Sequence, residues 1–164
     1  MTAIRALIGL FFVIALGLSL PASAAEPTHP EARLYDPVRD ASADVDAALF
    51  QALRENKRVI LVMGANWCHD SKSLAGRFET TRFKAMMEPK YVITYIDVGK
   101  PQIGEGRNLD IAKRFGIKKI KGTPTVLILS SEGMLLNKKD APGWRNAASR
   151  SDDAIFAYFE GFGR

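Results

Sequence analysis

The chain has 164 residues, an apolar fraction of 47% and a formal net charge of +5 at neutral pH. This length suits a single domain, and the composition is that of an ordinary globular protein without repeats or low-complexity tracts. The positive charge is mild, and basic and aromatic residues do not form a shared stripe. The sequence therefore argues against nucleic-acid binding.

Residues 1–24 are predicted to be a signal peptide. Arg5 supplies a positive start, residues 6–20 are apolar and uncharged, and residues 22–24 read Ala-Ser-Ala, the small-x-small pattern of a cleavage site. Cleavage after Ala24, or one residue later, would place the mature chain in the periplasm or outside the cell, with no membrane segment left. The alternative is an uncleaved leader that anchors the chain, because the uncharged run is just long enough to span a bilayer.

Residues 25–43 are predicted to form an N-terminal arm, and residues 44–164 the folded domain. The arm is rich in proline and charge, with Leu34-Tyr35 as a candidate edge strand. The first half of the domain is predicted to contain a helix over 45–57 with Asp44 as N-cap, a buried strand over 58–63, helices over 70–80 and 82–88, and a strand over 91–98.

The second half is predicted to begin with a loop over 99–107 and a helix over 109–115 that Asn108 caps. A strand over 123–129 and a hairpin partner over 134–136 follow. After a polar loop, the last helix carries four apolar or aromatic residues on one face: Ile155, Tyr158, Phe159 and Phe162. Helices alternate with strands, and the strands end in a hairpin. This order predicts an α/β fold with a central mixed β-sheet flanked by helices on both faces.

Cys68 is the single cysteine of the chain, so no internal disulfide can form. In an exported chain a lone cysteine is buried and inert, bonded to another molecule, or reactive. Cys68 lies between the strand over 58–63 and the N-terminus of the next helix. Backbone N–H groups and the helix dipole favour a thiolate there, and a thiolate is the form that attacks disulfides. The position therefore favours a reactive thiol.

Two segments resemble the thioredoxin family. The run Val59 to Lys72, containing Ala-Asn-Trp-Cys-His-Asp-Ser-Lys, resembles the active-site segment Ala-x-Trp-Cys-x-x-Cys-Lys that follows a strand in that family. The run Gly122-Thr123-Pro124-Thr125 resembles the family's cis-proline loop, which faces the cysteine. The resemblance extends from about residue 44 to the C-terminus. It implies a thioredoxin fold, and substrate contacts from Trp67, Thr123 and Pro124.

The departures from the family pattern predict a monothiol site. Ser71 stands at the position of the second cysteine, which in the family releases the substrate. Val62 and Ile93 stand at the positions of a buried acid and a lysine that help to move protons, and Gly76 replaces a proline that kinks the helix. Cys68 would then form a mixed disulfide with a client protein or glutathione and await an external thiol. This chemistry suits isomerisation or deglutathionylation.

Neighbouring side chains have candidate roles at the thiol. The Ser71 hydroxyl could donate a hydrogen bond to the Cys68 sulfur, protonated His69 would favour the thiolate, and Asp70 would oppose it. His69 could equally be an exposed spacer. A metal site built from Cys68, His69, Asp70 and His29 lacks a recognisable ligand spacing, so neither a metal nor a resident cofactor is expected, and glutathione would enter only as a co-substrate.

The partners expected are client thiols or disulfides, bound by a monomer. Lys118, Lys119 and Lys121 precede the Thr-Pro loop and could attract glutathione or acidic clients, or could simply be solvated. Two alternatives to a thiol–disulfide oxidoreductase or isomerase stay open. One is a non-catalytic module that grips a client around Trp67 and Pro124, and the other is a monothiol protein that binds a metal or cluster.

Overall fold

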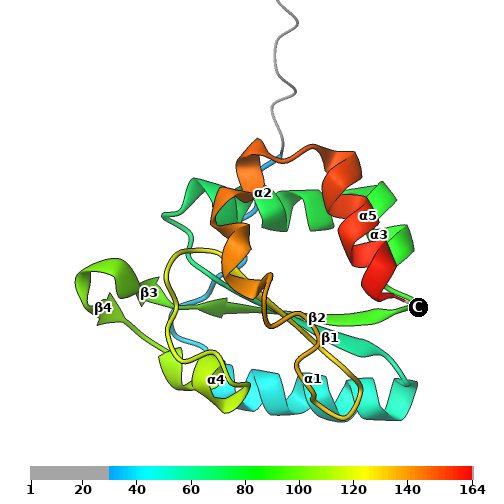
Figure 1. Ribbon diagram of the computed structural model, residues 1–164, viewed down its shortest axis with the longest axis horizontal. Helices are drawn as coiled ribbons and strands as arrows, with labels where there is room; N and C mark the ends of the chain where they lie inside the picture. Colours follow the sequence, from blue (N-terminus) through cyan, green and yellow to red (C-terminus); the bar gives the residue numbers. More distant parts are fainter. Residues whose placement is uncertain (1–29, 164) are drawn as a thin grey trace, which may run out of the picture.

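The computed structural model describes residues 30–163 (Figure 1). The predicted signal peptide, its cleavage site and His29 lie outside the described residues, and these predictions stay open. No helix between residues 30 and 163 combines the length and apolar character needed to cross a membrane.

A three-stranded mixed sheet forms the centre of the domain. Strand β1 (Arg58–Gly64) lies in the middle, β2 (Tyr91–Asp97) pairs with it in parallel, and β5 (Thr125–Leu129) pairs with it antiparallel. Every residue of β1 after Arg58 is buried. This is the reason β1 reads as a continuous apolar run, because both faces of a central strand are covered. The predicted mixed sheet is confirmed.

Helices cover both faces of the sheet (Figure 1). One face carries α1 (Ala41–Glu55) and α4 (Leu109–Arg114), and the other carries α2 (His69–Phe78), α3 (Thr81–Met87), the 3₁₀ segment η2 (Ala141–Ser149) and α5 (Asp152–Phe162). Because side chains alternate along a strand, Ile60 and Val62 of β1 enter the core under α2, whereas Val59 and Leu61 enter the core over α1.

The arm packs against the domain, and two predictions about it are wrong. Helix α1 begins at Ala41 with Asp40 as its N-cap, because the Asp40 side chain accepts a hydrogen bond from the Ala43 N–H at 3.0 Å. Asp44, the predicted cap, instead lies in the first turn and pairs with Arg39. Leu34-Tyr35 forms no strand in the described chain; Tyr35 is fully buried against Tyr95 of β2.

Gly76 allows the arm to cross α2. A Cβ atom added at Gly76 would lie 1.6 Å from the carbonyl oxygen of Pro30, so no larger residue fits without moving the arm. The helix runs without interruption from His69 to Phe78. The glycine is therefore explained by a close backbone approach, and the helix is not interrupted where the family's proline kinks it.

The predicted loop 99–107 contains a small hairpin. Strands β3 (Gly99–Lys100) and β4 (Glu105–Gly106) pair antiparallel around the 3₁₀ turn η1 (Pro101–Ile103), and the hairpin projects from the side of the domain (Figure 1). Asn108 occupies the N-cap position of α4, but its side chain does not cap the helix. Instead its Nδ2 donates a hydrogen bond to the Asp97 carbonyl oxygen at 2.8 Å. This bond connects the segment after the β3–β4 hairpin to the end of β2.

The C-terminal part also differs from its predicted layout. The 134–136 segment pairs with β5 through a single bridge, Leu129 to Leu135, and not through a regular strand. The predicted polar loop contains η2, whose Trp144 is fully buried and packs on Phe159 with ring centroids 4.9 Å apart. The predicted apolar face of the last helix is confirmed for Ile155 and Phe159, both fully buried.

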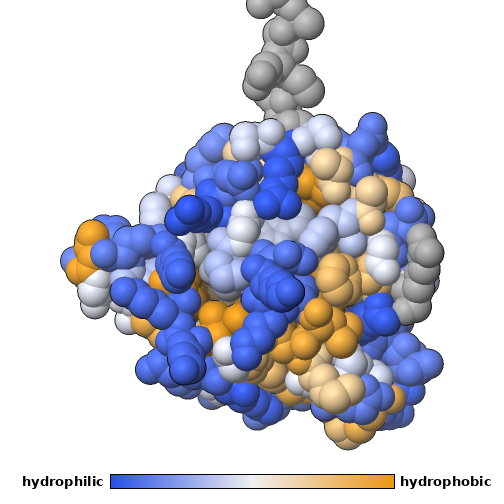
Figure 2. Space-filling view, viewed as in Figure 1, coloured by the Kyte–Doolittle hydropathy of each residue, from blue (hydrophilic) through white to orange (hydrophobic). Residues whose placement is uncertain are grey.

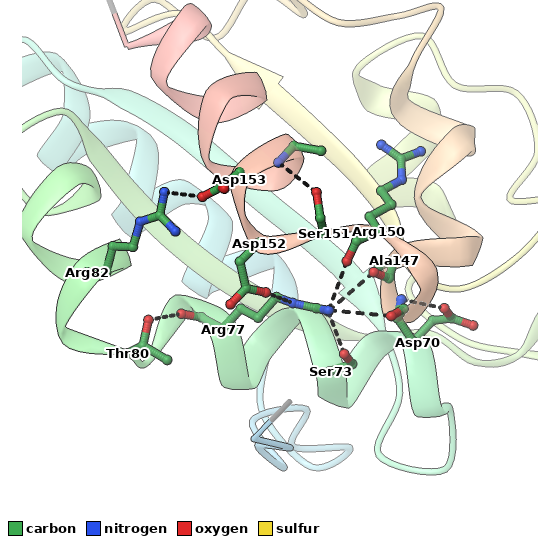
Figure 3. Close-up of polar contacts among 12 residues, drawn as sticks. Asp70, Ser73, Arg77, Thr80, Arg82, Ala147, Arg150, Ser151, Asp152 and Asp153 are labelled. Atoms are coloured by element: carbon green, nitrogen blue, oxygen red, sulfur yellow. Dashed lines mark hydrogen bonds and ion pairs between the residues drawn. The ribbon is translucent and has the colours of Figure 1, made fainter. Parts of the chain in front are cut away.

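Arg77 of α2 holds η2 and the start of α5 (Figure 3). Its side chain is fully buried, and its Nε donates to Asp152 Oδ1 at 2.7 Å. Its other nitrogens donate to the Ser73 hydroxyl and to the carbonyl oxygens of residues 147, 148 and 150. A buried charge is tolerated when it is paired and hydrogen-bonded in this way.

Candidate active site

Cys68 is the N-cap residue of α2. It follows the turn after β1, and its own N–H donates to the Ala65 carbonyl oxygen at 3.1 Å. Its backbone is extended (φ −86°, ψ 121°), and its side chain makes no capping hydrogen bond. The sulfur therefore lies at the positive end of the helix, where backbone N–H groups have no side-chain cap.

The Thr-Pro loop meets the cysteine. The Cys68 thiol donates a hydrogen bond to the Thr123 carbonyl oxygen, with 3.3 Å between sulfur and oxygen. The Thr123–Pro124 peptide bond is cis, and Thr125 Oγ1 donates to the Gly122 carbonyl oxygen at 2.9 Å across the same turn. The fold thus brings together two motifs that lie more than fifty residues apart in the sequence.

Trp67 lies on the surface beside the thiol. It is 52% exposed, and its Nε1 donates to the Gly99 carbonyl oxygen at 3.0 Å, so the β3–β4 hairpin fixes the ring. A groove of about 350 Å³ runs next to the ring, between Pro37 of the arm and Lys100 and Arg107 of the hairpin. Sequence reasoning missed the arm and the hairpin as parts of the site surface, because neither carries a recognisable motif.

His69 faces the arm. Its side chain is exposed, and its Nδ1 lies 2.6 Å from Glu31 Oε1, while the Lys72 ammonium donates to Glu31 Oε2 at 2.5 Å. The described contacts of His69 thus place it as a partner of the arm, and its predicted influence on the Cys68 thiolate stays a prediction.

Glu31 is expected to make stability depend on pH. Its pKa lies below the ordinary value of 4.5, first because Lys72 and then because His69 donate hydrogen bonds to the carboxylate. A carboxyl whose folded pKa is depressed stabilises the fold above its unfolded pKa, and this contribution is lost as pH falls through the folded pKa. The Glu31→Gln variant should therefore unfold at lower urea concentration than the wild type at pH 7, and the two should converge at strongly acidic pH.

Urea midpoints measured from pH 7 down to about pH 2 test this prediction, because this range crosses the ordinary pKa of a glutamate carboxyl. Glu132→Gln is a second test of the same effect, because contacts with Ser131 and Ser130 lower the pKa of Glu132, and its difference from the wild type should also shrink at acidic pH. If the urea midpoint of Glu31→Gln stays the same distance below that of the wild type at every pH, the ionisation of Glu31 does not contribute to stability and the prediction is wrong.

Asp70 faces η2. Its Oδ1 accepts a hydrogen bond from the Ala148 N–H at 2.8 Å, so the first turn of α2 is tied to η2 (Figure 3). With His69 held by the arm, the two spacer residues contact opposite flanks of the site. Within residues 30–163, no three His, Cys, Asp or Glu side chains gather closely enough to hold a metal ion.

Ser71 lies beneath the motif and does not contact the sulfur. Its side chain is fully buried, and its Oγ has no hydrogen-bond partner in the described part of the chain, so the predicted bond to Cys68 is wrong for this geometry. A Cβ atom added at Gly64 would lie 2.6 Å from this Oγ, which shows how tightly the hydroxyl is enclosed.

Tyr35 fills the space under the motif, and sequence reasoning missed it. Its hydroxyl donates to the Ser71 carbonyl oxygen at 3.1 Å, and burial raises its pKa well above 10, so it stays a neutral donor. Val62 and Ile93, at the positions of the family's acid and lysine, belong to or pack against the same apolar cluster. The only advance signal for Tyr35 was an aromatic residue in an otherwise polar arm.

Comparisons with known proteins agree with this architecture. A family model described as thioredoxin-like matches residues 40–131, which is more than half of the chain. The structure of a disulphide isomerase from Xylella fastidiosa Temecula1 is 28% identical, with a TM-score of 0.73, and the match covers 81% of this chain and 98% of that one. No curated protein matches the sequence significantly.

A second solved structure supports the fold alone. The reduced C-terminal domain of DsbD from Neisseria meningitidis is 20% identical with a TM-score of 0.50, and the match covers 75% of this chain and 96% of that one.

Proposed function

Because the chain belongs to the thioredoxin-like family, we propose that it is a thiol–disulfide exchange enzyme whose single nucleophile is Cys68. The observation that carries the proposal is the 3.3 Å contact between the Cys68 sulfur and the Thr123 carbonyl oxygen. It joins a cysteine at a helix N-terminus to a backbone loop that an extended substrate can follow. The similarity to a structure named as a disulphide isomerase, over nearly its whole length, supports the same class of chemistry.

The proposed reaction has two balanced steps. The Cys68 thiol loses its proton to solvent, and the thiolate attacks one sulfur of a substrate disulfide. A new Cys68–substrate disulfide forms, the old disulfide breaks, and the leaving sulfur departs as a thiolate with the bonding electrons. A second thiol then attacks the mixed disulfide at the substrate sulfur. This step regenerates the Cys68 thiolate and leaves one disulfide in the products, so no external oxidant is needed.

The second thiol must come from outside the chain. Cys68 is the only cysteine, and the Ser71 hydroxyl at the family's second position cannot resolve a disulfide. A thiol of the same client would give isomerisation, and glutathione would give deglutathionylation or reduction. We further propose that residues 1–24 direct export, that the mature protein works as a monomer in the periplasm or outside the cell, and that no resident cofactor takes part.

Isolation from the exported fraction in the presence of a thiol-blocking reagent tests the proposal. Non-reducing gels of the wild type should show clients linked to Cys68 that reductant releases, and Cys68→Ser should show none. Ser71→Ala is the matched control and should keep these adducts.

A client-binding module is the second candidate, because Trp67 is half-exposed beside a groove of about 350 Å³. It predicts the opposite result: no disulfide-linked client in the wild type, and the same non-covalent partners with wild type and Cys68→Ser. That outcome would sink the enzymatic proposal.

A further inference from the structure

The excess positive charge of the chain lies in one stretch. Residues 109–150 contain nine Lys or Arg and three Asp or Glu, out of 23 and 18 in the whole chain. Acidic residues thus slightly outnumber basic ones elsewhere. This stretch contains the loop that leads to Thr123 and the η2 segment packed beside it. Figure 2, viewed as Figure 1, shows hydrophilic groups interrupted by apolar ones on the side of the molecule that it presents.

Four of these cations border the thiol loop and are here called the basic rim: Lys118, Lys119, Lys121 and Arg145. All four are exposed. The three lysines lie within five residues of Thr123, whose carbonyl oxygen contacts the Cys68 sulfur. Their positive charge therefore lies on the segment that leads directly into the Thr-Pro loop.

Arg145 reaches the loop from η2. A Cβ atom added at Gly122 would lie 3.1 Å from both Cβ and Cδ of Arg145, so the aliphatic stem of the arginine lies across Gly122. Gly122 immediately precedes Thr123, and consecutive Cα atoms are only about 3.8 Å apart. The guanidinium is thus held beside the loop by packing of its stem, although it is far from Cys68 in sequence.

The rim cations have no carboxylate partner among residues 30–163, and other cations near the site do. Arg145 and the three rim lysines form no ion pair or hydrogen bond in the described chain. On the hairpin side of Cys68, by contrast, Lys100 pairs with Glu105 and Arg107 pairs with Asp97. One side of the thiol therefore carries charge that is balanced, and the other carries charge that is available to a ligand.

We propose that the Cys68 site prefers disulfides whose cysteine is flanked by Asp or Glu residues of an extended peptide, with the basic rim contacting those carboxylates. The inference rests on the proposed function, since it names the substrate class of the same thiol. Exposed ion pairs are individually weak, but several cations of one sign steer an oppositely charged partner and raise its association rate. The preference should therefore appear mainly in the association rate and weaken with salt.

Three mixed-disulfide peptides of equal length, with acidic, neutral or basic residues beside the cysteine, provide the test. The probe is the second-order rate of Cys68 adduct formation, followed by intact mass at low and high salt. Steering typically changes association rates by about 10-fold or more, so the acidic peptide should react about 10-fold faster than the neutral one at low salt. The basic peptide should be slowest, and high salt should compress the series.

Two variants distinguish an effect of the basic rim from an effect of the net charge of the protein. Arg145→Gln removes one rim cation and should lower the rate for the acidic peptide about threefold, with no change for the neutral peptide. Arg54→Gln removes the same charge from α1, which covers the opposite face of the sheet, and should leave all three rates unchanged.

Each outcome is informative. Equal rates for the three peptides, with exchange intact, would overturn the inference and leave the proposed function standing. Absence of an adduct with every peptide would overturn the proposed function itself. If Arg145→Gln reacts more slowly with oxidised glutathione but not with the acidic peptide, the basic rim binds the carboxylates of glutathione. The acidic-peptide proposal then fails.

Discussion

Replacing Ser71 by cysteine is expected to convert a persistent mixed disulfide on Cys68 into one that releases its substrate without help. Ser71 lies on the first turn of α2, one turn after Cys68, and although its enclosed hydroxyl does not contact the Cys68 sulfur, a thiol there would start within one helical turn of the mixed disulfide. Intramolecular attack by an oriented group corresponds to effective concentrations far above those of millimolar external thiols. The adduct should decay about 100-fold faster or more, with an internal disulfide as product.

Intact-mass measurements of the adduct after removal of free thiols check this prediction. Ser71→Ala is the control, because it removes the hydroxyl without supplying a thiol, and its adduct should last as long as that of the wild type. An adduct on Ser71→Cys that is as durable as the wild-type adduct would show that residue 71 does not reach the substrate disulfide. Ser71 would then not be the missing resolving position.

Replacing Arg77 by alanine is expected to destabilise the domain strongly. The arginine is fully buried, and it donates to Asp152, Ser73 and three carbonyl oxygens (Figure 3). Its loss would leave buried acceptors without their donor and weaken the attachment of η2 to α2, where the Asp70 contact with Ala148 would remain. Breaking a buried pair costs about 3–5 kcal/mol, and because Asp152 is 44% exposed, a loss of about 3 kcal/mol in unfolding free energy is expected.

Urea unfolding of Arg82→Ala provides the comparison. Arg82 of α3 also pairs with an aspartate of α5, Asp153, at 2.6 Å, but the two side chains are 52% and 84% exposed. An exposed pair of this kind contributes about 0–1 kcal/mol. Arg77→Ala and Arg82→Ala should therefore differ by about 2 kcal/mol or more. Equal losses would show that burial and the carbonyl contacts of Arg77 add nothing.

Short motifs made the fold and the two halves of the site predictable. Trp67-Cys68 after an apolar strand, and Thr123-Pro124 before another, placed the thiol and its facing loop, and the structure brings Cys68 and Thr123 into contact. The strand was predictable because a buried central strand is a continuous apolar run, and the facing loop was predicted from the family resemblance. The two segments meet because β5 runs antiparallel to β1, so the residues after β1 and those before β5 lie at the same end of the sheet.

The rest of the site depends on contacts that no local pattern records. Tyr35 reaches under Ser71 from an arm with no secondary structure, and Trp144 is buried from a segment that reads as a polar loop. The Ser71 hydroxyl was predicted to face the sulfur because of its spacing, yet tertiary packing against Gly64 and Tyr35 encloses it. The spacing of residues along a helix predicts which side of the helix a residue occupies, but it does not predict which residues pack against that side.

The same limit applies to the spacer residues. His69 and Asp70 looked like modifiers of the thiol because they are its sequence neighbours. In the structure His69 contacts Glu31 of the arm, and Asp70 contacts the Ala148 N–H of η2. Both partners lie far away in sequence, so their positions could only come from the folded chain.

Cys68 is expected to attack disulfides and to need an external thiol to complete the cycle. The most direct measurement is the intact mass of the purified protein after mixing with a small excess of a peptide disulfide, followed over time with and without added thiol. We expect one peptide per chain, bound through Cys68, stable in the absence of thiol and released when glutathione is added. A wild-type mass that stays unchanged under native conditions, while the unfolded chain does react, would contradict it.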